Sequence, residues 1–234
     1  MTRVALVTHW DGVAGPHCVL ALEQQGFHVI ANASEHTLLA AGAGRGVSSL
    51  EFDPSIEGRV RDCMARIADG FGALHVVVNN PGAWADAALD EITEGMWAEV
   101  LSQNLKATFY CSRAAAPLMV ASGGGRIINI TSSAGLSGAH TPFAVSCAGV
   151  MSLTRSMAIE LAPAVRVNSI AAGLLDEPWI DDAGADFRRS LESKIPLNRL
   201  CQPADIAEMV AFLASGGDFF TGQTFVLDGG ELRR

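Results

Sequence analysis

Lysine is scarce in this 234-residue sequence, which has only Lys106 and Lys194, and tyrosine is scarcer still, with only Tyr110. The formal net charge is −9, and no cluster of basic residues occurs along the chain. A protein that binds nucleic acid needs lysines and arginines gathered against the phosphate backbone. The composition therefore argues against a nucleic-acid partner, while the acidity itself selects no other partner and mainly favours solubility.

Paired cysteines are also missing. The five cysteines are odd in number and include no Cys-x-x-Cys pair; they are Cys18, Cys63, Cys111, Cys147 and Cys201. Disulfide frameworks need pairs, and zinc sites need closely spaced ligands. We therefore expect neither a disulfide nor a metal site, and a chain with free thiols suits a reducing cytoplasm.

Long apolar runs are lacking as well, since none reaches the roughly 20 residues of a membrane span. The first strand-like run, residues 4–7, is not preceded by a charged leader and a long apolar region, so we expect no secretion signal and no membrane partner. Apolar residues make up 49% of the chain, and no linker or repeat divides it. These features predict one globular domain over residues 1–234.

Short apolar runs alternate with longer segments of helical period. The predicted strands are residues 4–7, 27–31, 47–52, 75–78, 126–130, 165–170 and 224–227. The predicted helices are residues 14–25, 56–71, 96–121, 142–161 and 203–215, with a mobile helical excursion at 181–193. Strands that are apolar on both faces and separated by helices indicate a Rossmann-type, doubly wound parallel α/β sheet of about seven strands, with helices on both faces.

Several motifs, in order and spacing, resemble one family over nearly the full length. They are the turn Asn-Asn-Pro-Gly at 79–82, the segment 125–135 around Ser132, Arg-Val-Asn at 166–168, and the pair Thr-Gly-Gln and Leu-Asp-Gly-Gly at 221–223 and 227–230. The family is that of the short-chain dehydrogenases/reductases, in particular the bacterial ketoacyl and acetoacetyl-CoA reductases. The resemblance implies hydride transfer to or from a nicotinamide cofactor bound beyond the carboxyl ends of the strands.

The proton relay that this resemblance implies is missing. Family members place a tyrosine thirteen residues after the active-site serine and a lysine four residues further on. Ser132 matches the serine, but Val145 and Gly149 stand at the other two positions. A free tyrosine has a pKa of about 10, and the lysine lowers it toward the working range. Neither valine nor glycine can take either role, and glycine in place of arginine also argues against the related halohydrin dehalogenases.

The loop after the first strand departs from the family pattern Thr-Gly-x-x-x-Gly-x-Gly. Residues 8–15 read Thr-His-Trp-Asp-Gly-Val-Ala-Gly, so His9 and Val13 replace two glycines and only Gly15 is in place. The glycines of this loop let backbone N–H groups approach the cofactor pyrophosphate. The sequence therefore predicts that this chain binds no dinucleotide.

A shifted alignment of the same loop, using Gly12 and Gly15, is an alternative. Asp11 nevertheless favours loss of the phosphate site. A carboxylate just before a helix can cap its N-terminus and fill the place of a phosphate, and we expect Asp11 to do so.

Two further cofactor contacts differ. In the family a threonine after the sixth strand helps to hold the nicotinamide amide, and Glu177 stands at that position here. After the second strand, residues 32–34 (Asn-Ala-Ser) offer neither an acidic residue for a ribose diol nor an arginine for a 2′-phosphate.

Some positions of the family site survive. Ser132 and Asn104 match its serine and asparagine, Asp53 matches the residue near the adenine, and Asn79 matches the turn beside the cofactor. They could form a partly working site. We favour backbone roles, with Asn104 satisfying the long helix where it bends and Ser132 and Asn79 bonding to turns.

Three other residues have a chemical and a structural interpretation. His140, between Ser132 and the lost tyrosine, could replace the base, although a solvated loop histidine is the favoured interpretation. Cys147 is best interpreted as a buried thiol, because a nucleophile would need an activating base. Trp10 could be a packing plug in the cofactor cleft rather than a stacking residue.

The family scaffold is kept while its chemistry is lost, which favours a non-catalytic subunit. It would support a catalytically complete partner in a heterotetramer that acts as an NAD-dependent alcohol or 3-hydroxyacyl-CoA dehydrogenase, with NAD held by the partner. The family contains such heteromeric enzymes, including the (hydroxybenzyl)succinyl-CoA dehydrogenases, and its long helices, here 96–121 and 142–162, pack in pairs to build tetramers. Two alternatives remain: a redox-neutral lyase, hydratase or cyclase that uses Ser132 and His140 in the emptied cleft, or an NAD(P)-dependent oxidoreductase with an unrecognised proton relay.

Overall fold

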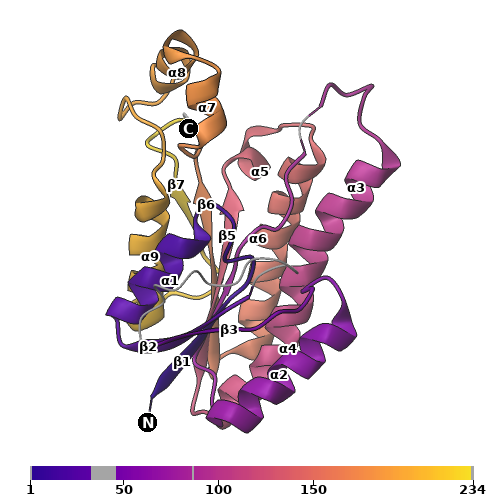
Figure 1. Cartoon of the computed structure of the whole chain (residues 1–234), viewed down its shortest axis with the longest axis vertical. Coiled ribbons are helices and arrows are strands. Elements are labelled where there is room, and N and C mark those ends of the chain that lie inside the picture. Colours follow the sequence, from indigo (N-terminus) through magenta and orange to yellow (C-terminus); the bar gives the residue numbers. More distant parts are fainter. Residues whose placement is uncertain (1, 33–45, 86, 233–234) are drawn as a thin grey trace.

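The computed structural model describes residues 2–32, 46–85 and 87–232, and in this part the chain forms a seven-stranded, fully parallel sheet with helices on both faces (Figure 1). The strand order is β3-β2-β1-β4-β5-β6-β7. The strands are β1 (Arg3–Val7), β2 (Phe27–Ala31), β3 (Val47–Ser49), β4 (Val76–Asn79), β5 (Gly125–Ser132), β6 (Val165–Ala172) and β7 (Thr224–Leu227). The order runs outward in both directions from β1 and β4, which confirms the predicted doubly wound fold.

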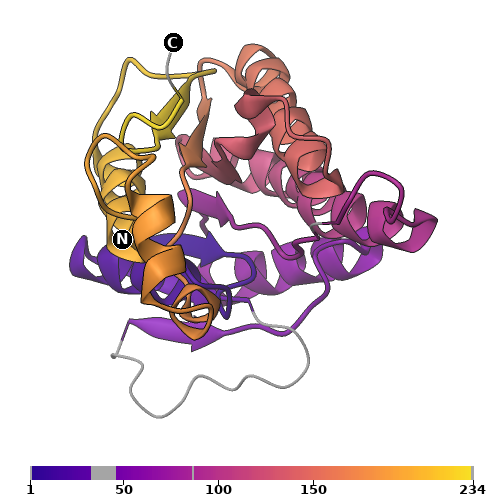
Figure 2. The ribbon, with the colours of Figure 1, turned by 90° about the horizontal axis from the view of Figure 1, so that it is seen from above.

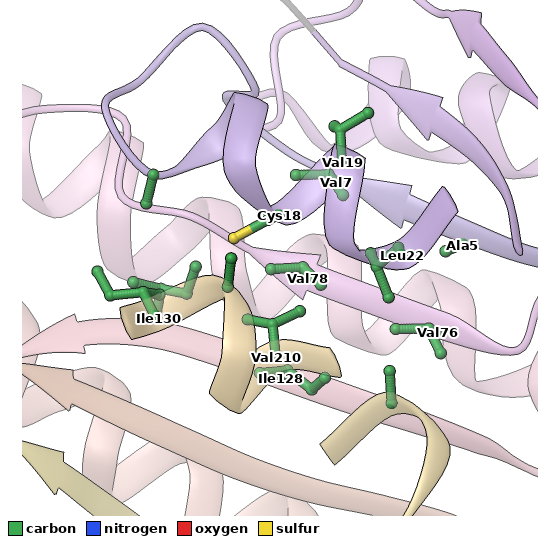
Figure 3. Packing of buried hydrophobic residues seen from close by; sticks show 14 of the residues in the cluster. Ala5, Val7, Cys18, Val19, Leu22, Val76, Val78, Ile128, Ile130 and Val210 are labelled. Carbon is green, nitrogen blue, oxygen red and sulfur yellow. The ribbon is translucent and has the colours of Figure 1, made fainter. Parts of the chain in front are cut away.

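Each face of the sheet has its own core, because side chains alternate along a strand. Ala5 and Val7 of β1 pack with α1 (Gly15–Gln24) and α9 (Pro203–Ser215), as Figure 3 shows for part of this cluster. Val4 and Leu6 point the other way and pack with three further helices. These helices are α2 (Glu57–Phe71), α4 (Ala107–Ala121) and α6 (Pro142–Leu161). Seen from above, the two groups of helices lie on opposite sides of the sheet (Figure 2).

The predicted helix over 96–121 is divided into three parts. It consists of α3 (Glu94–Val100), a π-helical turn η1 (Leu101–Lys106), and α4. The hydroxyl of Thr93 begins α3 by accepting the backbone N–H of Met96. Asn104 lies within the π-helical turn, and the hydroxyl of Thr108 donates to its carbonyl at 2.7 Å. The bend that we expected near Asn104 is therefore a change of helix type, which turns that side chain toward the loop after β4.

Other boundaries also differ from the prediction. The third strand is shorter than expected, and a short helix, α5 (Ala134–Ser137), follows β5. The segment predicted as a mobile excursion forms α7 (Pro178–Asp182) and α8 (Ala185–Glu192). Arg188 of α8 bonds to Asp176 and Asp181, so ion pairs fasten the two helices together.

The helix α6 corrects the expectation about apolar runs. It has 20 residues, and its most apolar 18-residue window has a mean hydropathy of 1.2, which is enough to cross a membrane by length and composition. Half of that window is buried within the fold. A half-buried apolar helix that packs on β5 and β6 has the character of a core helix in a globular domain.

Candidate functional site

The surviving family positions meet where β1, β4 and β5 end. Val7 is in register with Val78, and Asn79 is in register with Asn129. The backbone N–H of Asn80 donates to the hydroxyl of Thr8 at 3.1 Å. Parallel pairing thus brings the loops after β1 and β4 together at the edge of the sheet where ligands bind in this fold.

The loop that follows β1 is held tightly by its neighbours. His9 has a φ of 45°, a left-handed conformation that glycine adopts readily and a histidine adopts at a cost of roughly 1–3 kcal/mol. Its N–H donates to Oδ1 of Asn32 at 3.2 Å, and its carbonyl accepts Nδ2 of Asn80 at 2.9 Å. The N–H of Trp10 donates to the carbonyl of Asn32 at 2.9 Å. These bonds fix the backbone of the loop, which explains how His9 can remain in a left-handed conformation.

The imidazole of His9 lies against Gly82, the last residue of the Asn-Asn-Pro-Gly turn. A Cβ added to Gly82 would come within 2.4 Å of both Cε1 and Nε2 of the ring. Nε2 is buried and has no hydrogen-bond partner among the described residues. Burial lowers the pKa of His9, and Asp11, Asp53 and the carbonyl of Gln103 only partly oppose that shift. The ring is therefore favoured in its neutral form, packed between the two loops.

Trp10 and Gly15 make the second close contact of this loop. A Cβ at Gly15 would lie 2.0 Å from the carbonyl oxygen of Trp10, so only glycine fits there. The indole of Trp10 packs against the core of the α1 and α9 face, and its buried Nε1 has no hydrogen-bond partner in the described ranges. Trp10 is thus a packing residue at the edge of this core.

Asp11 does not have the position that we predicted. The helix α1 begins at Gly15, its N-cap residue is Ala14, and no side chain caps it there. Asp11 lies four residues before the first helical residue, so it is not the capping residue. The turn from Gly12 to Gly15 separates them, with the N–H of Gly15 bonded to the carbonyl of Gly12 at 2.9 Å.

The positions of the expected proton relay are on β5 and α6. Ser132 ends β5, and its Oγ accepts the N–H of Ala134 at 3.2 Å. Val145 is 42% exposed in the first turns of α6. Gly149 lies one turn later against Leu105. Neither position carries a group that can donate or accept a proton. Tyr110, the sole tyrosine, packs instead with the core of the α4 face, under the guanidinium of Arg113.

Asn104 is committed to structural bonds. Its Oδ1 accepts the N–H groups of Gly82 and Ala83, each at 3.0 Å. Its Nδ2 donates to the carbonyl of Ala83 at 2.8 Å and to Oγ of Ser146 at 3.0 Å. The side chain therefore joins the loop after β4 to the π-helical turn and to α6.

Asn79 lies in the core rather than in a turn. Its Nδ2 donates to Oδ1 of Asn129 at 2.8 Å and to Oγ of Ser112 at 3.0 Å. Asn129 in turn donates to Oγ1 of Thr154 at 2.9 Å. Oδ1 of Asn79 has no partner among the described residues. The expectation that Asn79 bonds to a turn is thus wrong, because its side chain crosses to α4 and β5.

The remaining candidate residues lie around the rim. Oδ1 of Asp53 accepts the N–H of Ser55 at 2.8 Å just before α2. Glu177 precedes α7, and burial raises the pKa of its carboxyl. Nε2 of the exposed His140 is 3.2 Å from the carbonyl of Ala87, so their bond joins two loops at the surface. Burial raises the pKa of the Cys147 thiol, which disfavours the thiolate that a nucleophile needs.

Metal ligands and the adenosine end complete the survey. All five cysteines are free. Within the described ranges, no three histidine, cysteine or acidic side chains gather in a way that could hold a metal ion. Asn32 is described, but Ala33 and Ser34, on which the expectation about ribose recognition also depends, lie outside the described residues.

Sequence reasoning missed the contact between His9 and Gly82. The sequence shows that histidine replaces a loop glycine, but it does not show which neighbouring loop the imidazole contacts. The signal that could have found it is the Asn-Asn-Pro-Gly turn itself, because a glycine without a Cβ leaves room for a ring from the neighbouring loop.

Comparisons with known proteins agree with this arrangement. A family model described as enoyl-(acyl carrier protein) reductase matches residues 12–231. The (2S)-[(R)-hydroxy(phenyl)methyl]succinyl-CoA dehydrogenase subunit BbsD of Thauera aromatica is 35% identical over 238 residues, which cover 98% of this chain and 96% of that protein.

Two solved structures share the whole fold. One is a short-chain type dehydrogenase/reductase from Mycobacterium marinum, with a TM-score of 0.90 at 28% identity. The other is a gluconate 5-dehydrogenase from Burkholderia cenocepacia in complex with NADP and tartrate, with the same TM-score and identity. Each alignment covers 99% of this chain and 96% of the other. Relatives with this fold therefore bind a nicotinamide cofactor.

Proposed function

The chain belongs to the short-chain dehydrogenase/reductase family, and we propose that it is a non-catalytic subunit of a hetero-oligomeric dehydrogenase. The complex would oxidise an alcohol or a 3-hydroxyacyl-CoA with NAD, in the cytoplasm. A catalytically complete relative would hold the cofactor and perform the reaction, and this chain would support it in a heterotetramer.

The observation that carries this proposal is the side-chain chemistry of α6. Val145 and Gly149 occupy the two positions of the proton relay, and neither can exchange a proton. Tyr110 is held in the core of the α4 face, and Lys106 lies along the outer groove between η1 and α6. Without a positioned acid or base, hydride transfer to a carbonyl loses a factor of roughly 10²–10⁴ in rate.

The intact scaffold supports a role other than turnover. Both cores are closely packed, and the polar network of Asn79, Asn129 and Thr154 is kept inside them. Random loss of function would also erode these packed and hydrogen-bonded positions. The relative from Thauera aromatica is itself named as a dehydrogenase subunit, which supports the hydroxyacyl-CoA assignment.

The geometry of the loop after β1 supports assigning the dinucleotide to the partner subunit. The imidazole of His9 fills the space in front of Gly82, and the loop that carries it is fixed by bonds to Asn32 and Asn80. The cofactor of the proposed complex is therefore assigned to the partner, and no step of the reaction is assigned to this chain.

The groove between α6 and the continuous segment formed by α3, η1 and the start of α4 is the surface proposed for the partner. It has a volume of about 820 Å³ and is lined mainly by apolar side chains and serines. Its lining includes Leu101, Leu105, Phe109, Gly149 and Leu153. An apolar groove between two long helices suits packing against the helices of a second subunit.

Co-expression tests the proposal. The chain would be produced alone and together with a catalytically complete family member from the same organism, and oxidation of 3-hydroxyacyl-CoA by NAD⁺ would be measured. We expect no turnover by the chain alone, stable co-purification, and a partner that is more active or more stable in the complex. Turnover by the isolated chain at an ordinary enzymatic rate would overturn the proposal.

A further inference from the structure

The loop between β1 and α1 presents a side chain where its relatives present only backbone. His9 replaces the first glycine of the family loop, directly after Thr8 at the end of β1. Its φ of 45° keeps the glycine-like backbone path. The imidazole therefore projects from a backbone position whose conformation glycine adopts readily.

The neighbouring residues show where that imidazole lies. It packs on Gly82, where an added Cβ would meet three ring atoms at 2.4–2.8 Å. Burial lowers the pKa of the ring, and the carboxylates of Asp11 and Asp53 and the backbone of Gln103 are near enough to oppose that shift in part. Asp53 is the position that corresponds to the adenine end of the cleft, and Gly82 belongs to the turn beside the cofactor. The ring therefore stands between the adenosine end and the turn.

We propose that the imidazole of His9 is a built-in occupant of the dinucleotide cleft, which takes the space of the adenosine–pyrophosphate half and excludes the cofactor. This inference rests on the proposed function, and it attributes the loss of cofactor binding in this chain to one residue. A planar ring with a buried, unpartnered Nε2 resembles part of a bound heterocycle more than a surface histidine. The three hydrogen bonds that hold residues 9 and 10 prevent the loop from carrying the ring away.

The closest alternative explanation is that loss of loop glycines alone abolishes binding. The two explanations differ in what they predict for single substitutions. If His9 is the occupant, removing its ring suffices even though Val13 remains. If the loss of the glycines is at fault, His9→Asn changes nothing, because it removes the ring without restoring a glycine and Val13 still stands at the second glycine position.

The test is dinucleotide binding to the purified full chain, measured by calorimetry with NAD⁺, NADH and NADPH. His9→Gly removes the ring at a backbone position that glycine favours. The control His140→Gly removes an exposed imidazole from another loop. His9→Asn is the second variant, because asparagine tolerates a positive φ. Thermal melts would establish that each variant is folded.

We expect His9→Gly to bind at least one dinucleotide at least about tenfold more tightly than the natural chain and His140→Gly do. Free imidazole should compete with that binding by refilling the cavity. His9→Asn should gain affinity as well. The proposal is overturned if folded His9→Asn binds no more tightly than the natural chain, even where His9→Gly does, because His9→Gly also restores a loop glycine. A gain in His140→Gly would overturn it too.

This result is separable from the proposed function. If both His9 variants fail to gain affinity while the isolated chain stays inactive and pairs with its relative, only the occupant is refuted. If the isolated chain turns over substrate, the function is refuted whatever the binding data show.

Discussion

Gly149 lies against Leu105 of the π-helical turn, and a Cβ added at position 149 would be 3.0 Å from Cδ2 of Leu105. That distance is tighter than ordinary packing, so the leucine occupies the space that a side chain on α6 would need. A side chain at position 149 would therefore require Leu105 to shift by a few tenths of an ångström.

Restoring the relay residues alone should therefore fail. We expect the double variant Val145→Tyr, Gly149→Lys to show no oxidation of 3-hydroxyacyl-CoA, because Leu105 crowds the lysine and His9 fills the cleft. The triple variant that adds His9→Gly is the informative comparison in the same NADH absorbance assay. Turnover by the double variant would mean that the cleft already accepts the cofactor.

Asn104 should matter for stability. Removing its amide in Asn104→Ala leaves the N–H groups of Gly82 and Ala83 and the hydroxyl of Ser146 without their partner. We expect a loss of about 2–3 kcal/mol in the free energy of unfolding. Urea denaturation measures it, with Ser102→Ala on the same π-helical turn as the control. Equal effects of the two substitutions would contradict the structural role.

The stability of the chain should fall on mild acidification, partly through His9. Burial lowers the pKa of His9 in the folded state below its ordinary value of 6.5. The unfolded chain then binds the proton more readily, so stability contributed by the neutral ring is present above pH 6.5 and is lost as the pH falls toward the folded pKa.

Denaturation of the natural chain and of His9→Asn between pH 8 and pH 5 would isolate this contribution, because His75, whose pKa is also lowered, is common to both. The natural chain should show the steeper loss. Parallel curves would mean that His9 is not buried as a neutral ring.

The groove between α6 and the α3–η1 segment should be needed for pairing. Ser156 lies exposed on its lining, so Ser156→Arg adds a bulky charge with little effect on the fold. We expect association with the complete relative to weaken by at least about tenfold, as measured by light scattering or co-purification. Ser215→Arg, in the separate groove between α1 and α9, is the matched control. Pairing that survives the first and not the second would assign the partner to the α1 and α9 side.

His140 should be dispensable for dehydrogenase activity of the complex. It is exposed, and its ring bonds to the carbonyl of Ala87 rather than to Ser132. The hydroxyl of Ser132 accepts the backbone N–H of Ala134 instead. His140→Ala should leave the rate unchanged in the co-expressed complex. Loss of an elimination or hydration activity in this variant would instead favour a redox-neutral enzyme.

The sequence by itself determined the fold class and the loss of the relay. Strands that are apolar on both faces, separated by helices, leave the parallel sheet as the arrangement that buries them. The separation of Ser132 from Val145 and Gly149 follows from the order of residues alone, and a helix places Val145 and Gly149, four residues apart, on one face.

Only the tertiary structure decided which side chains are in contact at the positions of the family's active site. His9 meets Gly82, and Asn104 meets Ser146, across long stretches of sequence. Local pattern predicted one helix over 96–121 and a cap at Asp11, whereas long-range bonds to Asn104 favour a π-helical turn and α1 begins after Ala14. Such contacts depend on how distant loops approach each other at the sheet edge, and periodicity within one segment carries no information about that approach.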